Sequence, residues 1–341
     1  MGTSMSKLSR RTVVRTALAT PLAFGIMRSR AEAAEFVFKF GSNVPATYPL
    51  NVRVKEAAER IRTATHGRFD LQLFPAGQLG TDTDMLSQVR TGAIQFYTAS
   101  GSVLSTLVPV AAINAVGFAF KDYSQVWPAM DGKLGALIRS KVDAVGLHAV
   151  DKIFDIGFRE ITSSTHPIDA PKDLKGFKIR IPPSDLGVSL FRALGASPAT
   201  LNFAEAYTAL QTHVVDGQEN PLSIIDTAKF YEVQKYASMT NHQWDGFWML
   251  ANGPAWKKLP ADIREVVTHE LGSAAIADRK DIADLNASLE STLKAKGMTF
   301  NTTDPASFRA KLAQAGFYAH WRQAFGTQSW DLLESYVGHI G

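Results

Sequence analysis

In the first half of the chain, hydrophobic and polar positions alternate with two different periods. Three apolar stretches have the period-two pattern of strands, at residues 36–40, 69–73 and 94–99. Between them, apolar side chains recur at helical spacing over residues 54–64 and 82–92. Strands that are separated by helices need crossover connections, so the pattern predicts an α/β fold with a mostly parallel sheet.

The same alternation starts again at residues 151–159, which indicates a second lobe. A short strand is predicted at 177–181, and helices are predicted from Asn202 onward and over 224–234. A last, much longer helical segment runs from Pro260 to about Lys296. At about 1.5 Å per residue it extends roughly 54 Å, which is enough to span two lobes.

The first 33 residues have the features of an export signal. Arg10 and Arg11 precede an apolar run over 16–27, and Ala31-Glu32-Ala33 has the small-x-small form of a signal peptidase site. The run is too short to span a bilayer. The paired arginines resemble the twin-arginine signal, and an ordinary secretory signal is the alternative. Both predict a mature chain that works outside the cytoplasm, in the periplasm.

This leader also accounts for the charge of the protein. The formal net charge is +4, but residues 1–33 hold six basic side chains and one acidic side chain, so the remainder carries −1. A nucleic-acid partner is therefore not expected. The chain has no cysteine, which excludes disulfides and thiol chemistry.

Catalytic motifs are nearly absent from the sequence. No nucleotide-binding glycine motif, HExxH or GxSxG occurs, and the histidines lack metal-ligand spacing. Asp82 and Asp84 can bind a cation or cap a helix. Asp216 and Glu219 can form an acid/base pair, although such carboxylates are common beside a turn. We expect no enzyme, no metal and no cofactor.

Several residues are suited to hold an anion. Arg180 lies on the polar side of the predicted strand 177–181, near the carboxyl end where open α/β sheets bind ligands. A guanidinium matches a carboxylate in a bidentate fork, and a structural salt bridge is the alternative. Arg159 and Asn220 are further candidates. Trp244, Phe247 and Trp248 form either a core or a wall on which a ring can stack.

These residues lie in blocks that resemble the extracytoplasmic solute receptors of tripartite ATP-independent periplasmic (TRAP) transporters, the DctP family, and especially their sialic-acid branch. The resemblance covers nearly the whole mature chain. Its blocks are Phe40-Gly41-Ser42-Asn43, Pro75-Ala76-Gly77-Gln78-Leu79-Gly80, Gly157-Phe158-Arg159, Leu174-Lys175-Gly176-Phe177-Lys178-Ile179-Arg180-Ile181-Pro182, Phe203-Ala204-Glu205-Ala206-Tyr207, Val215-Asp216-Gly217-Gln218-Glu219-Asn220-Pro221 and Tyr231-Glu232-Val233-Gln234-Lys235-Tyr236.

The resemblance implies a two-lobed flytrap with a long lobe-spanning helix. We expect lobe I at 34–157 plus 246–285 and lobe II at 158–245 plus 286–341. It implies that Arg180 clamps the ligand carboxylate. The matching positions for further contacts are Arg159, Asn43, Phe203 and Asn220.

Two departures from the sialic-acid branch bear on the ligand. Ser100 stands where that branch has an acidic residue, and Pro183-Ser184 replace an asparagine. These departures argue against sialic acid itself and leave an organic acid.

The leading hypothesis is a monomeric periplasmic receptor that delivers an organic acid to a TRAP permease. A sugar acid of the uronate kind is favoured, because its ring can stack on Trp244 and its hydroxyls can bond to Asn43, Ser100 and Asn220, which an aromatic monocarboxylate would leave unpaired. An aromatic or other small organic acid is the alternative ligand. A receptor that signals to a sensor kinase and an extracytoplasmic enzyme are the alternatives.

Overall fold

A computed structural model describes residues 33–341 of the chain. The predicted twin-arginine motif, apolar run and most of the cleavage site fall on residues 1–32, outside the described residues. No helix in residues 33–341 is long and apolar enough to cross a membrane.

The described residues contain ten strands in one sheet. They are β1 (Phe36–Gly41), β2 (Phe69–Phe74), β3 (Phe96–Ser100), β4 (Leu147–Ala149), β5 (Phe154–Ser163), β6 (Lys178–Ile181), β7 (Ser197–Thr200), β8 (Gly217–Asn220), β9 (Tyr236–Asn252) and β10 (Thr299–Thr302). Their order is β2-β1-β3-β9-β5-β8-β6-β7, and β4 and β10 also pair with β9.

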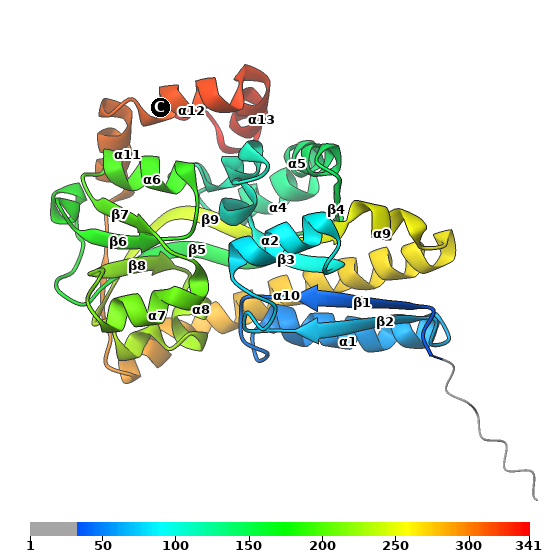
Figure 1. Cartoon of the computed structure of the whole chain (residues 1–341). Coiled ribbons are helices and arrows are strands. Elements are labelled where there is room, and N and C mark those ends of the chain that lie inside the picture. The colour runs from blue at the N-terminus through cyan, green and yellow to red at the C-terminus, as the bar shows by residue number, and fades with distance from the viewer. Residues whose placement is uncertain (1–32) are drawn as a thin grey trace, which may run out of the picture. The chain divides into compact units, whose positions relative to one another are not determined.

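The sheet is mixed rather than mostly parallel. The pairs β1–β2, β1–β3, β6–β7 and β6–β8 are parallel, as the crossover pattern predicts. The two strands at the centre, β5 and β9, pair antiparallel with each other, and β9 also pairs antiparallel with β3. Both central strands run through the two lobes, so they connect the β2-β1-β3 side to the β8-β6-β7 side (Figure 1).

Helices cover both faces of this sheet (Figure 1). One face carries α2, α4, α5, α6 and α11–α13, and the other carries α1, α7, α8 and α10. Their bounds are α1 (Pro49–Ala64), α2 (Asp82–Thr91), α3 (Gly101–Leu104), α4 (Tyr123–Asp131), α5 (Lys133–Ala144), α6 (Asp185–Ala193), α7 (Phe203–Gln211), α8 (Leu222–Thr227), α9 (Gly253–Lys258), α10 (Ala261–Ala295), α11 (Pro305–Gln314), α12 (Phe317–Phe325) and α13 (Thr327–Val337).

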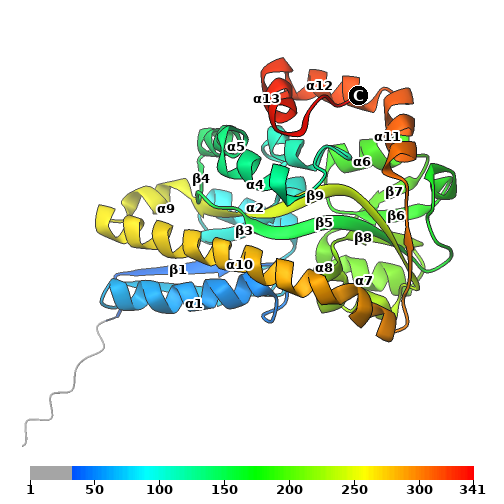
Figure 2. The same ribbon diagram turned by 180° about the vertical axis from the view of Figure 1, so that it is seen from behind.

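The long helix α10 confirms the prediction from the apolar pattern. It runs along one face of the sheet from the α1 side to the α7 and α8 side (Figure 2). Its 35 residues correspond to about 52 Å. It contacts α1, α8 and β5, so a single helix braces both lobes.

Local sequence signals predicted the ends of most helices and strands to within a few residues of where the structure has them. Thr81 and Asp84 form the capping box that begins α2, and Gly92 ends it in the left-handed conformation. The helix predicted over 224–234 is an exception, because α8 ends at Thr227. Lys229 takes a left-handed φ of 57° there, and this breaks the helix before Tyr231.

Candidate functional site

A small cavity of about 30 Å³ lies where strand ends and helix starts from both lobes meet. Six of the seven predicted ligand contacts line it: Asn43, Ser100, Arg159, Arg180, Phe203 and Asn220. Asn43 follows β1, Ser100 and Asn220 end β3 and β8, and Phe203 begins α7. These carboxyl-terminal strand ends are where open α/β sheets place ligands.

Arg180 is a buried cation that has no acidic partner among residues 33–341. Its side chain is on β6, and the residue is only 1% exposed. Nε and Nη2 donate to the carbonyl oxygen of Leu201 at 3.0 and 2.7 Å. Within the described residues, no carboxylate approaches the guanidinium to within 4.0 Å. Burial lowers the pKa of Arg180 to about 10, so the side chain keeps its charge at neutral pH.

Arg159 differs because the protein already supplies its counter-charge. Its Nε donates to Glu219 Oε2, and its Nη2 donates to Glu219 Oε1 at 2.7 Å. Nη1 lies 4.0 Å from Asp245 Oδ2. Burial by itself raises the pKa of Glu219, but the Arg159 charge and the hydrogen bonds from His242 and Arg159 together outweigh burial and lower that pKa to about 2. Arg159 is therefore fixed by an ion pair at the centre of the sheet.

His242 extends this ion pair. Its Nε2 lies 3.3 Å from Glu219 Oε2, and its Nδ1 lies 2.8 Å from the Thr240 hydroxyl. Burial lowers the pKa of His242, although the Glu219 carboxylate opposes that shift. Glu219 thus serves to position Arg159 and His242. Asp216, its predicted acid/base partner, instead accepts a hydrogen bond from the Lys178 backbone N–H at 3.1 Å.

Oxygen atoms of the polar side chains in the cavity can still accept hydrogen bonds from a ligand. Asn43 Nδ2 donates to Asp82 Oδ1 at 2.6 Å, while Asn43 Oδ1 is buried with no partner among the described residues. Asn220 Nδ2 donates to Gln218 Oε1 at 2.6 Å. The Ser100 hydroxyl accepts from the Val103 backbone N–H at 3.2 Å. A ligand with hydroxyl groups can donate to these oxygens.

Trp244 does not line the cavity, contrary to the prediction of a stacking wall. It is completely buried in the core, where Nε1 donates to Asp155 Oδ1 at 3.0 Å. The rings of Trp127 and Phe120 pack edge-on against it, with centroids 5.6 and 6.3 Å away. Side chains alternate along β9, so Trp244 faces the side of α4 while Phe247 faces the cavity.

Sequence reasoning missed Asp82 and most of the apolar lining. Asp82 is the first residue of α2, is 2% exposed, and points its carboxylate into the cavity wall. The sequence motif Asp82-Thr83-Asp84 indicated a cation ligand or a helix cap. At the start of α2, Asp84 and not Asp82 forms the capping box with Thr81. The other residues that were missed are Val44, Val103, Ile156, Pro182 and Ile224.

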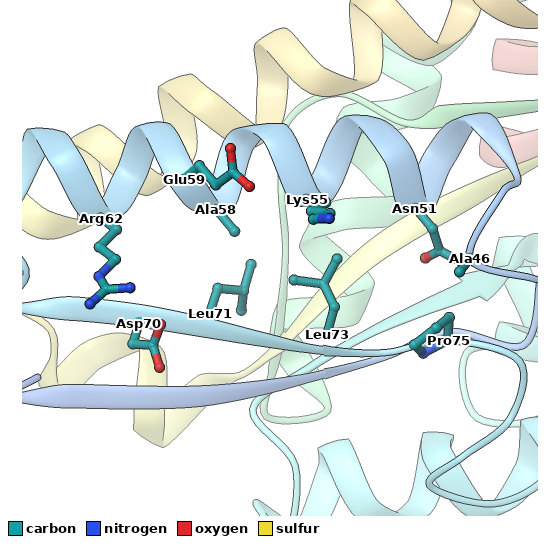
Figure 3. Close-up of a pocket in the computed structure, with 10 residues that line it drawn as sticks. All are labelled: Ala46, Asn51, Lys55, Ala58, Glu59, Arg62, Asp70, Leu71, Leu73 and Pro75. Carbon is teal, nitrogen blue, oxygen red and sulfur yellow. The ribbon is translucent and has the colours of Figure 1, made fainter.

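A larger groove of about 400 Å³ lies elsewhere, between α1 and the edge strand β2 (Figure 3). Lys55, Glu59 and Arg62 border it from the helix, and Asp70 borders it from the strand. The groove is open and mixes both signs of charge. Among its described lining residues, no cation is both buried and unpaired, so the smaller cavity around Arg180 is the candidate binding site.

Comparison with known proteins agrees with this geometry. Residues 40–321 match the model of the DctP family, "Bacterial extracellular solute-binding protein, family 7". A solute-binding protein of Roseobacter denitrificans is 32% identical over 287 residues, which is 84% of this chain and 88% of the relative. Its structure with bound L-galactonate has a TM-score of 0.82 at 30% identity, covering 89% of this chain and 99% of that one.

Two further structures have the same fold and different ligands. A TRAP periplasmic solute-binding protein from Polaromonas, bound to D-erythronate, has a TM-score of 0.84 at 30% identity and covers 88% of this chain and 99% of its own. One from Sulfurospirillum deleyianum, bound to succinate, has a TM-score of 0.82 at 31% identity and covers 90% and 100%.

The match over most of the chain and the two-lobed fold around a buried arginine lead to one conclusion. This chain belongs to the DctP family of bacterial extracellular solute-binding proteins, the solute receptors of TRAP transporters.

Proposed function

We propose that the protein is the periplasmic receptor of a TRAP transporter, and that it captures a sugar acid by its carboxylate and delivers it to the membrane permease. The observation that carries the proposal is Arg180, a buried guanidinium with no acidic partner within the described residues. A desolvated charge of this kind is costly unless an anion joins it. A ligand carboxylate supplies that anion in a bidentate fork.

The rest of the cavity supports a hydroxylated acid over an aromatic one. Asn43 Oδ1 has no partner in the described part of the chain, and an aromatic acid would leave it unpaired at a cost of about 1 to 3 kcal/mol. The apolar residues Val44, Val103 and Phe247 can contact the carbon chain or one face of a sugar ring. The Roseobacter and Polaromonas relatives hold hydroxylated monocarboxylates, L-galactonate and D-erythronate.

Delivery requires that the lobes open and close around the cavity. We place lobe I at 34–157 plus 246–285 and lobe II at 158–245 plus 286–341. The register of β5 against β9 shifts between Asp155 and Gly157 and again between Arg159 and Ile161. These irregularities lie at the proposed junction, where a hinge can absorb changes in backbone angle. We propose that the receptor acts as a monomer.

A thermal-shift screen tests the function directly. L-galactonate, D-erythronate, D-galacturonate and benzoate are each added to the mature protein and to Arg180→Ala. A sugar acid at 100 times its dissociation constant should add about 2.7 kcal/mol of stability. Stabilisation of the wild type by a sugar acid, without stabilisation of Arg180→Ala, supports the proposal. No stabilisation by any sugar acid, or stabilisation by benzoate only, contradicts it.

A further inference from the structure

Asp82 connects the two sides of the cavity. As the first residue of α2, it accepts a hydrogen bond through Oδ2 from the backbone N–H of Phe203, the first residue of α7, at 2.7 Å. Its Oδ1 accepts from Asn43 Nδ2 at 2.6 Å. Nearby, the Thr83 hydroxyl lies 3.4 Å from Asn202 Oδ1. The carboxylate therefore sits between the starts of two helices that are 121 residues apart in the chain.

The start of α7 is a position that favours an anion. The first backbone N–H groups of a helix have no partner within the helix, and the helix dipole adds positive potential there. In this protein the N–H of Phe203 is already bonded to the buried Asp82 carboxylate. The protein thus fills this position with its own negative charge.

Arg180 is the cavity cation that no carboxylate of the described residues contacts within 4.0 Å. Arg159 is paired with Glu219 and lies 4.0 Å from Asp245. Among the acidic groups, Asp82 acts most strongly on Arg180, yet no Lys or Arg nitrogen of the described residues lies within 4.0 Å of Asp82. One ligand carboxylate can bond to Arg180 directly. A second carboxylate would meet Asp82, where no Lys or Arg nitrogen of residues 33–341 is close enough to offset the repulsion.

We propose that Asp82 makes this receptor selective for acids with a single carboxylate, because its own carboxylate occupies the place and the hydrogen bonds that a second ligand carboxylate would take. The inference rests on the proposed function and narrows its substrate class. The relative that holds succinate has the same fold, so the overall architecture by itself does not exclude diacids. The choice between monoacids and diacids must lie in local residues such as Asp82.

Two matched pairs of acids test this selectivity by calorimetry. L-galactonate is compared with galactarate, and D-erythronate with meso-tartrate, so that the second acid of each pair differs by one terminal carboxylate. The wild type should bind the monoacid of the better-bound pair at least 100-fold more tightly. In Asp82→Asn, which keeps an oxygen for the Phe203 N–H, this ratio should fall at least tenfold through tighter binding of the diacid.

Asp84→Asn is the matched control. It removes the same charge two residues further along α2, at an exposed position, and should leave the ratio unchanged within about threefold. Two results would overturn this inference while leaving the proposed function intact. One is equal affinity of the wild type for both acids of a pair, and the other is an unchanged monoacid-to-diacid affinity ratio in a folded Asp82→Asn protein. If Asp82→Asn does not fold, the wild-type ratio decides. Failure of the wild type to bind any of the four acids overturns the proposed function as well.

Discussion

Arg180 and Leu201 are joined by two hydrogen bonds, from Nε and Nη2 of the guanidinium to the same carbonyl oxygen. This contact fixes the plane of the guanidinium without neutralising its charge. Nη1 makes no such bond to the described residues and stays available at the cavity. The backbone carbonyl of Leu201 therefore orients the Arg180 guanidinium, while a ligand carboxylate is left to compensate its charge.

Removing Arg180 should therefore weaken binding strongly. We expect Arg180→Ala to cost roughly 2 to 5 kcal/mol of binding free energy, which is about 30-fold to several thousand-fold in affinity. Arg180→Lys should not restore it, because an ammonium lacks the planar fork. Calorimetry with the best sugar acid measures the effect, and the exposed Arg192→Ala serves as a control. An affinity of Arg180→Ala within threefold of the wild type would exclude Arg180 from the site.

The two arginines should differ in the stability of the ligand-free protein. Arg159→Ala leaves Glu219 buried without its ion-pair partner, which should cost about 3 to 5 kcal/mol of unfolding free energy. Arg180→Ala removes a desolvated charge with no acidic partner in the described residues, so the change should be below about 1 kcal/mol. Urea unfolding of both variants without ligand checks this. Equal destabilisation would mean that Arg180 also has a structural ion pair.

Trp244 should behave as a core residue. Trp244→Ala should lower the unfolding free energy of the ligand-free protein by about 3 to 5 kcal/mol, because the indole packs against Trp127 and Phe120. Trp244→Phe should recover part of the packing but not the hydrogen bond to Asp155. Cyclic and linear acids should lose affinity to the same degree. A selective loss for cyclic acids, with an unchanged melting temperature, would restore the stacking role.

Glu160 should make stability fall as the pH rises. Burial raises the pKa of Glu160 from its ordinary 4.5 to about 8. Between these values the folded state holds a proton that the unfolded chain has lost, so folding becomes less favourable with increasing pH. Glu160→Gln removes this titration. It should match the wild type near pH 4.5 and exceed it by up to about 5 kcal/mol above pH 8.

Unfolding curves at several pH values measure that difference. The exposed Glu265→Gln is the control for the loss of one acidic group. The wild type contains other buried acids, such as Asp155, whose pKa burial raises to about 7. Only the difference between the wild type and Glu160→Gln reports on Glu160. A difference that does not change with pH would show that Glu160 does not titrate in this range.

Ligand should change the shape of the protein if the lobes close like a flytrap. The ligand must then bind the closed form more tightly than the open form. Small-angle scattering should give a smaller radius of gyration with a saturating sugar acid than without it. Identical radii in both states, at proven saturation, would contradict lobe closure.

Local sequence patterns determined most of the fold. Period-two stretches became β1, β2 and β3, and the capping signals at Thr81 and Gly92 bound α2. The long helical segment became α10. These elements follow from interactions within a few residues, which is the range that a sequence pattern encodes. Of the predicted residues that line the cavity, Arg180, Arg159 and Asn220 were indicated by residue type and position, while Asn43, Phe203 and Ser100 came only from comparison with the family.

The tertiary structure decided which faces and which distant residues meet. Both faces of β9 are covered by helices and both carry large buried apolar side chains, so its sequence cannot show whether Trp244 or Phe247 faces the ligand. The pairing of Glu219 with Arg159 and of Asp82 with Phe203 joins residues 60 and 121 positions apart. Such contacts form only when the sheet order brings strand ends and helix starts together, because charge and hydrogen-bonding energies depend on distance in space and not along the chain.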